Sequence, residues 1–442
     1  MTTSGARSRQ RLELTFPDAK PLYASGEAVA EASRCLYCHE APCVAACPTG
    51  IDVPGFIRKI ATGNLRGSAR TILSANLLGY SCARVCPVEV LCVGKCVYND
   101  WHREPPIQIG RLQRYAVETV LGGGAALFAR APRAGRRVAC VGAGPASLAA
   151  AGYLALEGVE VTLYEKRAIA GGLNATGVAP YKMHAEGAEL EVDFIRSLGV
   201  TIRTGVEVGK DVSPADLLRD HDAVFIGVGL GADSPLGLPG EDGAGVVGAT
   251  AWIERMKLEP GFAVGEVLRA VVVGGGNTAI DAARELKRLG VPSVTIAYRR
   301  TTAEMPGYRH ELDQALREGV RLAEQAVPKA IRRQASGQLA ALQLQNGQEL
   351  AADLVVLAIG QARTGALAAS FDGVVVDERG RVAADPATGV TGNPKVFVGG
   401  DALNGGGLVV TAAQEGKRAA RAIARALGLK IRVDAPMGAG HP

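Results

Sequence analysis

The sequence is poor in aromatic residues, which make up 5% of its 442 residues. Proteins that bind single-stranded nucleic acid generally stack its bases on aromatic side chains. Charge is also nearly balanced, because 49 basic and 44 acidic residues leave a formal net charge of +5. No long basic run accompanies this small excess, so neither nucleic acid nor a membrane surface is an expected partner.

Long apolar segments are missing as well. Residues 1–20 are polar and lack the apolar core of a signal peptide. The longest apolar stretch, residues 138–156, is interrupted by Gly142, Gly144, Pro145 and Gly152. This stretch is expected to form a buried strand, a turn and a helix instead of a membrane span. The expected location of the protein is therefore the cytoplasm.

Cysteine is nearly absent outside one short block. Eight of the nine cysteines lie between Cys35 and Cys96, and only Cys140 lies elsewhere. Cytoplasmic proteins rarely hold disulfides, so a block of this density predicts metal binding. The spacing is Cys-x2-Cys-x4-Cys-x3-Cys-Pro in the first group and Cys-x3-Cys-Pro-x4-Cys-x3-Cys in the second. The cysteines are, in order, Cys35, Cys38, Cys43 and Cys47, then Cys82, Cys86, Cys92 and Cys96.

Short spacings of this kind suit [4Fe–4S] clusters, and in bacterial ferredoxins the cysteine before proline binds the other cluster. By that rule Cys47, which precedes Pro48, shares a cluster with the second group. Eight thiolates then hold two [4Fe–4S] clusters. Structural zinc is the main alternative, because Cys-x2-Cys also suits zinc.

Two glycine-rich turns follow apolar strands in the rest of the chain. The first, residues 142–147, follows strand residues 137–141 and opens a helix, and Glu165 ends the next strand. Glycines let the backbone approach a pyrophosphate at the helix N-terminus, and the acid can accept hydrogen bonds from the ribose hydroxyls. The alternative is a glycine turn that binds no ligand.

Further features favour FAD at this first turn. Gly171-Gly172-Leu173 resembles the FAD-binding continuation of glutathione-reductase-like flavoproteins. Gly400-Asp401 ends a buried strand, as in that superfamily, in which the aspartate holds the flavin ribityl chain. The helix at residues 408–427 can direct its N-terminal dipole at the flavin. A helix or turn cap is the alternative role for Asp401. The residues assigned to FAD are Gly142, Ala143, Gly144, Pro145, Ala146, Ser147, Glu165, Lys166, Gly172, Leu173, Gly400, Asp401, Gly407, Leu408 and Val409.

The second glycine turn, residues 274–279, predicts a nicotinamide dinucleotide site. The strand after it, residues 294–298, ends in Arg299 and Arg300, where an NAD site generally has an acid. Arginine can pair with a 2′-phosphate, which favours NADPH. The alternative is that the two arginines are solvated surface residues, and the site would then also accept NADH. The residues assigned to this site are Gly274, Gly276, Asn277, Thr278, Arg299 and Arg300.

FAD and a nicotinamide in one chain predict hydride transfer between cofactors, which needs no acid–base side chain, so no catalytic residue is assigned. No closely spaced cysteine pair lies near the expected flavin site. Cys140 stands alone in an apolar strand and is expected to be a small core residue. Electrons would therefore leave through iron–sulfur clusters, a role that redox-inert zinc cannot fill.

The order of these features predicts an α/β fold. An all-helical iron–sulfur domain precedes two Rossmann-like domains of the glutathione-reductase-like type, with the NAD(P) domain inserted into the FAD domain. The expected bounds are 1–120 for the iron–sulfur domain, 121–136 for a linker, 137–234 and 359–430 for the FAD domain, 235–358 for the NAD(P) domain, and 431–442 for a tail.

Nearly the whole chain, residues 29–427, resembles a family of NAD(P)H-linked reductase modules. The match is carried by residues 34–38, 41–43, 46–48, 84–87 and 91–96. The family includes the glutamate synthase small subunit and the NAD(P)H-oxidising part of dihydropyrimidine dehydrogenase. Residues 107–114 distinguish these branches, because glutamate synthase-like members generally have Glu where this chain has Gln113. Dihydropyrimidine dehydrogenases have Gln there, and Ser147 also resembles that branch.

The resemblance implies a revised set of iron ligands. It implies one cluster on Cys35, Cys38, Cys43 and Cys96, and another on Cys47, Cys86, Cys92 and the side chain of Gln113. Cys82 would then lie near the second cluster without binding iron. The alternative for Gln113 is an amide on a helix surface.

The resemblance also implies a partner. Dihydropyrimidine dehydrogenase reduces uracil or thymine at an FMN in a separate barrel domain, for which this chain has no room. An FMN-barrel subunit with further iron–sulfur clusters is therefore the expected partner, in a heteromeric oxidoreductase of pyrimidine degradation. One alternative is a glutamate synthase small subunit or a related electron-bifurcating subunit. Another is an electron-transfer scaffold that docks a ferredoxin-like protein.

Overall fold

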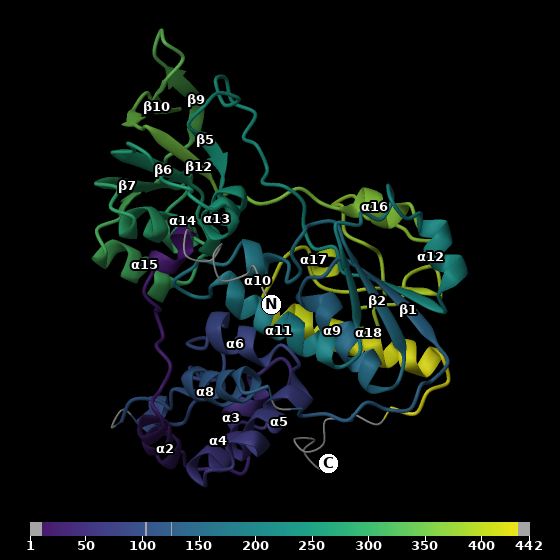
Figure 1. The fold of residues 1–442 in the computed structure, drawn as a ribbon. Coiled ribbons are helices and arrows are strands. Elements are labelled where there is room, and N and C mark those ends of the chain that lie inside the picture. Colours follow the sequence, from purple (N-terminus) through teal and green to yellow (C-terminus); the bar gives the residue numbers. More distant parts are fainter. Residues whose placement is uncertain (1–10, 102–103, 125, 432–442) are drawn as a thin grey trace. The chain divides into compact units, whose positions relative to one another are not determined.

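The structure is a computed structural model that describes residues 11–101, 104–124 and 126–431 (Figure 1). The chain divides into two compact units. Unit 1 contains the described part of Met1–Pro17 together with Thr176–His184 and Gly231–Ala362. Unit 2 contains Asp18–Ala175, Ala185–Leu230 and the described part of Arg363–Pro442. The expected tail, residues 431–442, lies outside the described residues except for its first residue.

Unit 2 begins with a helical part that holds the cysteine block. Asp52 starts helix α4 by accepting a hydrogen bond from the Gly55 N–H at 2.9 Å, and Asn64 starts α5 in the same way through Gly67. Such caps satisfy backbone donors that the first helical turn leaves free. The helices are α2 (Ser25–Ser33), α3 (Pro42–Ala45), α4 (Val53–Ala61), α5 (Leu65–Ala75), α6 (Gly79–Val85), α7 (Tyr98–Trp101) and α8 (Ile109–Gly122).

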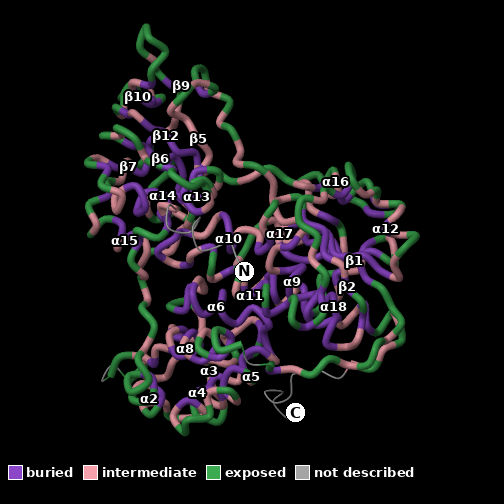
Figure 2. The backbone as a smooth tube through the Cα atoms, in the orientation of Figure 1, coloured by how far each residue is buried: buried purple, intermediate pink, exposed green. Residues whose placement is uncertain are grey.

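The rest of unit 2 is a parallel sheet in the order β13-β4-β1-β2-β3. Figure 2 shows that strands β1 and β2 and helices α9 and α18 are largely buried, as expected for a sheet covered on both faces. The strands are β1 (Arg137–Val141), β2 (Glu160–Glu165), β3 (Thr201–Thr204), β4 (Ala223–Ile226) and β13 (Val396–Val398). The helices in this stretch are α9 (Pro145–Leu156), α10 (Leu173–Thr176), α11 (Ala185–Ser197), α12 (Pro214–Asp220), α16 (Gly365–Ala369), α17 (Asp401–Asn404) and α18 (Val409–Ala426).

Unit 1 contains a second parallel sheet, in the order β5-β12-β6-β7-β8, and an antiparallel sheet in the order β11-β10-β9. The first is made of β5 (Val246–Gly248), β6 (Arg269–Val273), β7 (Ser293–Ala297), β8 (Arg321–Ala323) and β12 (Leu354–Leu357). The second is made of β9 (Pro328–Arg333), β10 (Leu339–Leu344) and β11 (Glu349–Ala351). The helices are η1 (Leu12–Thr15), α13 (Ala249–Leu258), α14 (Asn277–Arg288), η2 (Thr302–Glu304) and α15 (Arg309–Arg317).

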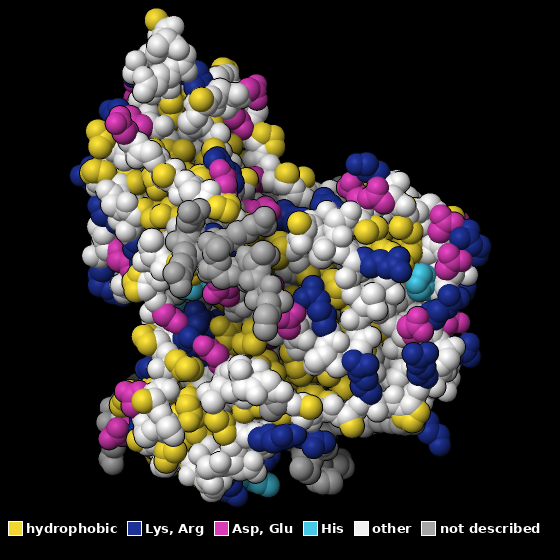
Figure 3. Space-filling model, in the orientation of Figure 1, with side chains coloured by type: hydrophobic (Ala, Val, Ile, Leu, Met, Phe, Trp, Pro, Cys, Tyr) yellow, Lys and Arg dark blue, Asp and Glu magenta, His cyan; other side chains and the backbone are white. Residues whose placement is uncertain are grey.

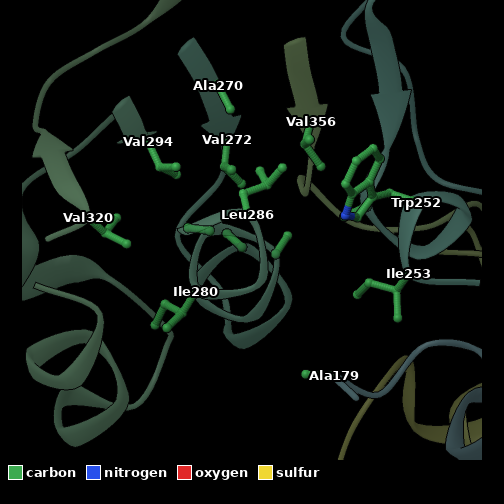
Figure 4. Close-up of a cluster of buried hydrophobic side chains, with 14 of the residues drawn as sticks. Ala179, Trp252, Ile253, Ala270, Val272, Ile280, Leu286, Val294, Val320 and Val356 are labelled. Atoms are coloured by element: carbon green, nitrogen blue, oxygen red, sulfur yellow. The ribbon is translucent and has the colours of Figure 1, made fainter. Parts of the chain in front are cut away.

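The core of unit 1 lies between its parallel sheet and two helices (Figure 4). Val272 and Val294 project from the strands, Leu286 from α14 and Trp252 from α13, and each of these side chains is buried. Apolar side chains that share one helical face bury that face against the sheet. This packing positions α14, whose N-terminus follows the second glycine turn.

A short segment of unit 1 lies far from the rest of that unit in sequence. In Thr176–His184, the Tyr181 hydroxyl donates to Asp281 Oδ1 at 2.6 Å. Lys182 Nζ lies 2.8 Å from the same oxygen and 2.6 Å from Glu311 Oε2. The Tyr181 ring is fully buried. The segment is therefore held to helices α14 and α15 by a buried polar network.

The expected fold class is confirmed, with a helical part followed by two Rossmann-type sheets. Strand β1 coincides with predicted residues 137–141. The antiparallel sheet of unit 1 has no counterpart in the sequence-based expectation, and the domain bounds stay predictions. Within the described ranges, no helix has both the length and the apolarity of a membrane span. On the face drawn in Figure 3, basic and acidic side chains are interspersed.

Candidate functional site

The first glycine turn joins β1 to the N-terminus of α9. Gly142 has φ +86°, and a Cβ at this position would lie 2.8 Å from the Gly227 carbonyl oxygen. Only glycine combines this left-handed backbone with so close an approach. The turn therefore leads directly into α9, whose first N–H groups have no partner within the helix.

A second glycine loop packs against this turn, backbone to backbone. Gly172 has φ +56°, and a Cβ there would lie 2.7 Å from Gly144 Cα. The Gly171 N–H donates to the Ala143 carbonyl at 2.9 Å. Together the loops form a side-chain-free cradle at the N-terminus of α9. A pyrophosphate fits such a cradle, because backbone N–H groups and the helix dipole both favour an anion.

Glu165 ends β2 beside this cradle and is buried. Its carboxylate accepts hydrogen bonds from the Ala143 N–H at 2.8 Å and the Arg167 N–H at 2.9 Å. A carboxylate has about four acceptor positions, so further hydrogen bonds are possible. These contacts hold Glu165 against the glycine turn. Its contact with a ribose stays a prediction. Lys166, the next residue, is exposed.

Asp401 follows β13, at the carboxyl edge of the same sheet. Its Oδ1 accepts a hydrogen bond from the Gly407 N–H at 3.1 Å, just before α18. Burial raises the pKa of Asp401, an effect that the Gly407 hydrogen bond and the Arg363 charge oppose. This contact is the turn-cap role that the sequence left open. The predicted contact with a flavin ribityl chain stays a prediction.

The second glycine turn lines a cavity of about 570 Å³ within unit 1. Cofactor pockets generally have volumes of this order. A Cβ at Gly274 would lie 2.3 Å from the Ala358 carbonyl oxygen, and one at Gly275 would lie 2.4 Å from the Tyr298 ring. The turn therefore also requires glycine. The cavity is lined by Asp233, Leu236, Thr250, Val273, Gly274, Gly275, Gly276, Thr278, Ala297, Tyr298, Arg299, Arg300, Glu304, Pro306, Ala326, Pro328, Ala358, Ile359, Gly360 and Gln361.

Arg299 and Arg300 line this cavity and are exposed. The fold thus brings the arginine pair and the glycine turn to one site, as predicted from their places after neighbouring strands. Glu304 lines the same cavity and accepts hydrogen bonds from the Thr301 N–H and hydroxyl. These hydrogen bonds, and then the charge of Arg300, lower the pKa of Glu304. Arg300 therefore lies within electrostatic range of the Glu304 carboxylate, which lines the same cavity.

Each cysteine of the block is a free thiol. Four of them, Cys35, Cys38, Cys43 and Cys96, line one apolar cavity in the helical part. Burial, and then the neighbouring Cys35 and Cys96, raise the pKa of Cys43 to about 12. Thiols that raise one another's pKa in this way need a positive centre to become thiolates together. The donor set therefore fits an iron–sulfur cluster, and it is the set that the resemblance implies.

A second group lies around Cys86, at the C-terminus of α6. A hydrogen bond with Cys82, then burial and the neighbouring Cys92 and Cys47, raise the pKa of Cys86 well above its usual value. Burial and Cys47 likewise raise the pKa of Cys92 to about 12. Cys47 thus interacts with two cysteines of the second group. Its predicted place as a ligand of that cluster stays a prediction. In the described chain, no three His, Cys, Asp or Glu side chains are placed to hold a single metal ion, whereas the thiolates of a [4Fe–4S] cluster bind separate iron atoms.

Cys82 lies on α6, and Gln113 contacts the first residue of that helix. Gln113 is buried on α8 and its Nε2 donates to the Gly79 carbonyl at 2.7 Å. The sulfur of Cys82 is buried as well and accepts a hydrogen bond from Asn76 Nδ2 at 3.1 Å. Gln113 is therefore not an amide on a helix surface. That Gln113 completes the ligand set of the second cluster, and that Cys82 binds no iron, stays a prediction.

Glu191, which is not among the predicted site residues, lies on α11 and is fully buried against the start of α6. Its Oε1 accepts hydrogen bonds from the Tyr80 and Ser81 N–H groups at 3.0 and 3.2 Å, and its Oε2 accepts one from the Ser81 hydroxyl. Burial raises the pKa of Glu191 to about 7, although these hydrogen bonds oppose the shift. Glu191 thereby anchors the helix that leads to Cys86. No local pattern in the sequence could have indicated this contact.

Two family models match the chain. Residues 13–124 match the 4Fe–4S cluster domain II of dihydropyrimidine dehydrogenase, and residues 136–416 match the pyridine nucleotide-disulphide oxidoreductases. The chain is 35% identical to the NAD-dependent dihydropyrimidine dehydrogenase subunit PreT of Escherichia coli, over 91% of this chain and 95% of that protein. It is 32% identical to the glutamate synthase [NADPH] small chain of Escherichia coli, over 93% of this chain and 94% of that protein.

Solved structures show the same fold. The thioredoxin reductase of T. acidophilum matches 65% of this chain and 98% of its own, with a TM-score of 0.54 and 24% identity. An identity this low shows likeness of fold alone. The oxidoreductase model, by contrast, spans more than half of the chain, and the two relatives match over nearly their full length. The chain therefore belongs to the pyridine nucleotide-disulphide oxidoreductases that carry an N-terminal 4Fe–4S domain, the group that includes PreT and the glutamate synthase small chain.

Proposed function

We propose that this protein is the NAD(P)H-oxidising subunit of a heteromeric dihydropyrimidine dehydrogenase. When bound, FAD accepts hydride from NAD(P)H, and two [4Fe–4S] clusters relay the electrons to a partner that carries FMN and reduces uracil or thymine. The observation that supports this proposal best is a buried Gln113, and not a Glu, against the first residue of α6, the helix that leads to Cys86. The similarity to PreT over 95% of that protein supports it independently.

The residues of the chain have distinct parts in this proposal. The cradle around Gly142 and Gly172 holds the FAD pyrophosphate at the N-terminus of α9. The cavity beside Gly274 holds the nicotinamide dinucleotide, with Arg299 and Arg300 at one edge. The two cysteine groups hold the clusters, and the apolar lining around the first group limits the access of water to its iron.

The division of labour can be tested with the purified chain. We expect one FAD, about eight iron and about eight sulfide per chain. With NAD(P)H the chain should reduce an artificial dye and leave uracil unchanged, whereas a complex with an FMN-containing partner should reduce uracil. Zinc in place of iron would contradict the cluster assignment. Uracil reduction by the isolated chain would contradict the need for a partner.

The runner-up is the small subunit of a glutamate synthase, or of a related electron-bifurcating reductase. It is supported by 32% identity over 94% of the Escherichia coli small chain. The partner that co-purifies with the chain distinguishes the two. An FMN-barrel partner supports pyrimidine reduction, and a large glutamine-binding partner supports glutamate synthesis.

The choice between NADH and NADPH is a separate prediction. One of the two relatives is named as NAD-dependent, and the other is named with NADPH. We expect Arg300→Ala to raise KM for NADPH by about tenfold or more, since a hydrogen bond to a charged group contributes about 1.5–3 kcal/mol. KM for NADH should change little. Arg317→Ala is the control, because Arg317 lies on α15 and does not line the cavity. Equal effects on both nucleotides, or a wild type that prefers NADH, would assign Arg299 and Arg300 to the solvated surface.

A further inference from the structure

Lys417 is a buried lysine that links the two parts of unit 2. It lies on α18, the helix that begins after Asp401, and its residue is 3% exposed. Its Nζ donates to the Ala75 carbonyl at 2.7 Å, at the last residue of α5 in the helical part. The Tyr153 ring lies 5.4 Å from the same nitrogen. Its ammonium group therefore sits inside the protein, away from water.

The surroundings of Lys417 lead to the second cysteine group. Ala75 is followed by Asn76, whose side chain donates to the sulfur of Cys82 at 3.1 Å. Cys82 lies on α6, one helical turn before Cys86, which directly follows the helix. The two thiols interact through a hydrogen bond. Burial, and then the charge of Arg421, lower the pKa of Lys417 to about 8, whereas an electrostatic interaction with Cys47 opposes this shift. Lys417 therefore lies within electrostatic range of Cys47, a cysteine assigned to the second group.

A buried cation generally requires compensating negative charge. One neutral carbonyl and one aromatic ring provide only part of this compensation for Lys417. Within the described residues, the ammonium group contacts this carbonyl and this ring and forms no ion pair with a carboxylate. An iron–sulfur cluster bound by thiolates carries negative charge, which increases when the cluster is reduced. Because cluster potentials depend on net charge and surroundings, a fixed cation nearby stabilises the reduced form.

We propose that Lys417 is a potential-tuning residue, which raises the midpoint potential of the cluster held by Cys47, Cys86 and Cys92. This inference rests on the proposed function, because it requires that cluster to be present. It assigns to α18 a second task beside its place at the expected flavin site. Through Lys417, the helix places a fixed positive charge beside the second cluster.

The test is a redox titration of the full chain with its clusters assembled, followed by electron paramagnetic resonance. Lys417→Gln removes the charge and keeps a hydrogen-bond donor, and Lys417→Met removes the charge with an apolar side chain of similar length. Each variant should lower the ratio of reduced to oxidised second cluster about tenfold at a fixed applied potential. For one electron, this corresponds to a midpoint potential that is lower by about 59 mV. Lys417→Arg should keep the wild-type potential. Arg418→Gln is the control, because it removes the same charge from an exposed neighbour on α18.

Iron and sulfide content, measured on each variant, separates the possible outcomes. A wild-type chain without iron would overturn the proposed function itself. Full clusters with unchanged potentials in Lys417→Gln and Lys417→Met would overturn only the role of Lys417. If neither neutral variant assembles the second cluster, Lys417 supports the fold and the tuning role is wrong. An equal shift in Arg418→Gln would also overturn it, because the effect would then be one of net charge.

Discussion

Gly142→Val should abolish FAD binding. Gly142 has φ +86°, and its Cβ would lie 2.8 Å from the Gly227 carbonyl oxygen, so a branched side chain cannot fit without moving the backbone. The turn between β1 and α9 would open, and the N–H groups at the start of α9 would no longer converge on one anion. We expect FAD content to fall below about one tenth of the wild-type value. Dye reduction with NAD(P)H should fall roughly 100-fold or more, equivalent to about 2.7 kcal/mol.

Gly205→Val is the matched control for this effect. Gly205 lies in the same unit with φ +73°, and a Cβ there would meet no atom within 4 Å. The substitution should cost about 1–2 kcal/mol of stability through backbone strain and leave FAD bound. FAD is measured by absorbance after release from the denatured protein, and iron content reports whether the helical part has folded. A Gly142→Val chain that retains its FAD would show that the cradle is not the pyrophosphate site.

Gln113→Ala should make the second cluster labile. The Gln113 side chain is buried, and the hydrogen bond from Nε2 to the Gly79 carbonyl fixes the plane of the amide. If its oxygen binds iron, alanine leaves that iron open to water and oxygen. We expect iron to fall from about eight to about four per chain after exposure to air, while the first cluster remains. Iron analysis and electron paramagnetic resonance before and after exposure measure the loss.

Two further variants decide which side chain completes the ligand set. Gln113→Glu replaces a neutral ligand by an anion and should lower the potential of the second cluster while keeping its iron. Cys82→Ser should have little effect on the cluster, because Cys82 is assigned no iron. The hydroxyl introduced by the substitution can still accept the hydrogen bond from Asn76. The opposite pattern, in which Cys82→Ser destroys the cluster and Gln113→Ala leaves its spectrum and potential unchanged, would establish the eight-cysteine arrangement. The main support for the pyrimidine branch would then be lost.

Both glycine turns follow from local sequence. Each is a run of apolar residues followed by glycines and an Ala-rich helix, and the structure places β1 at residues 137–141 and β6 at 269–273. Such patterns are readable because a strand, its turn and its helix are neighbours in sequence, and each glycine is required by the backbone itself. The interaction of Cys47 with the second set was also predictable, since the Cys-Pro rule describes a recurring local geometry.

The contacts that join the parts of the protein could be found only in the tertiary structure. Glu191 reaches the start of α6 across 110 residues of sequence, and Lys417 reaches Ala75 across 342. Tyr181 is buried against α14 within unit 1, although the chain around its segment belongs to unit 2. A glutamate or lysine in a helix looks the same in sequence whether it faces water or a distant element. Its role is decided when packing removes it from water, because the buried charge then requires a partner that only the fold can supply.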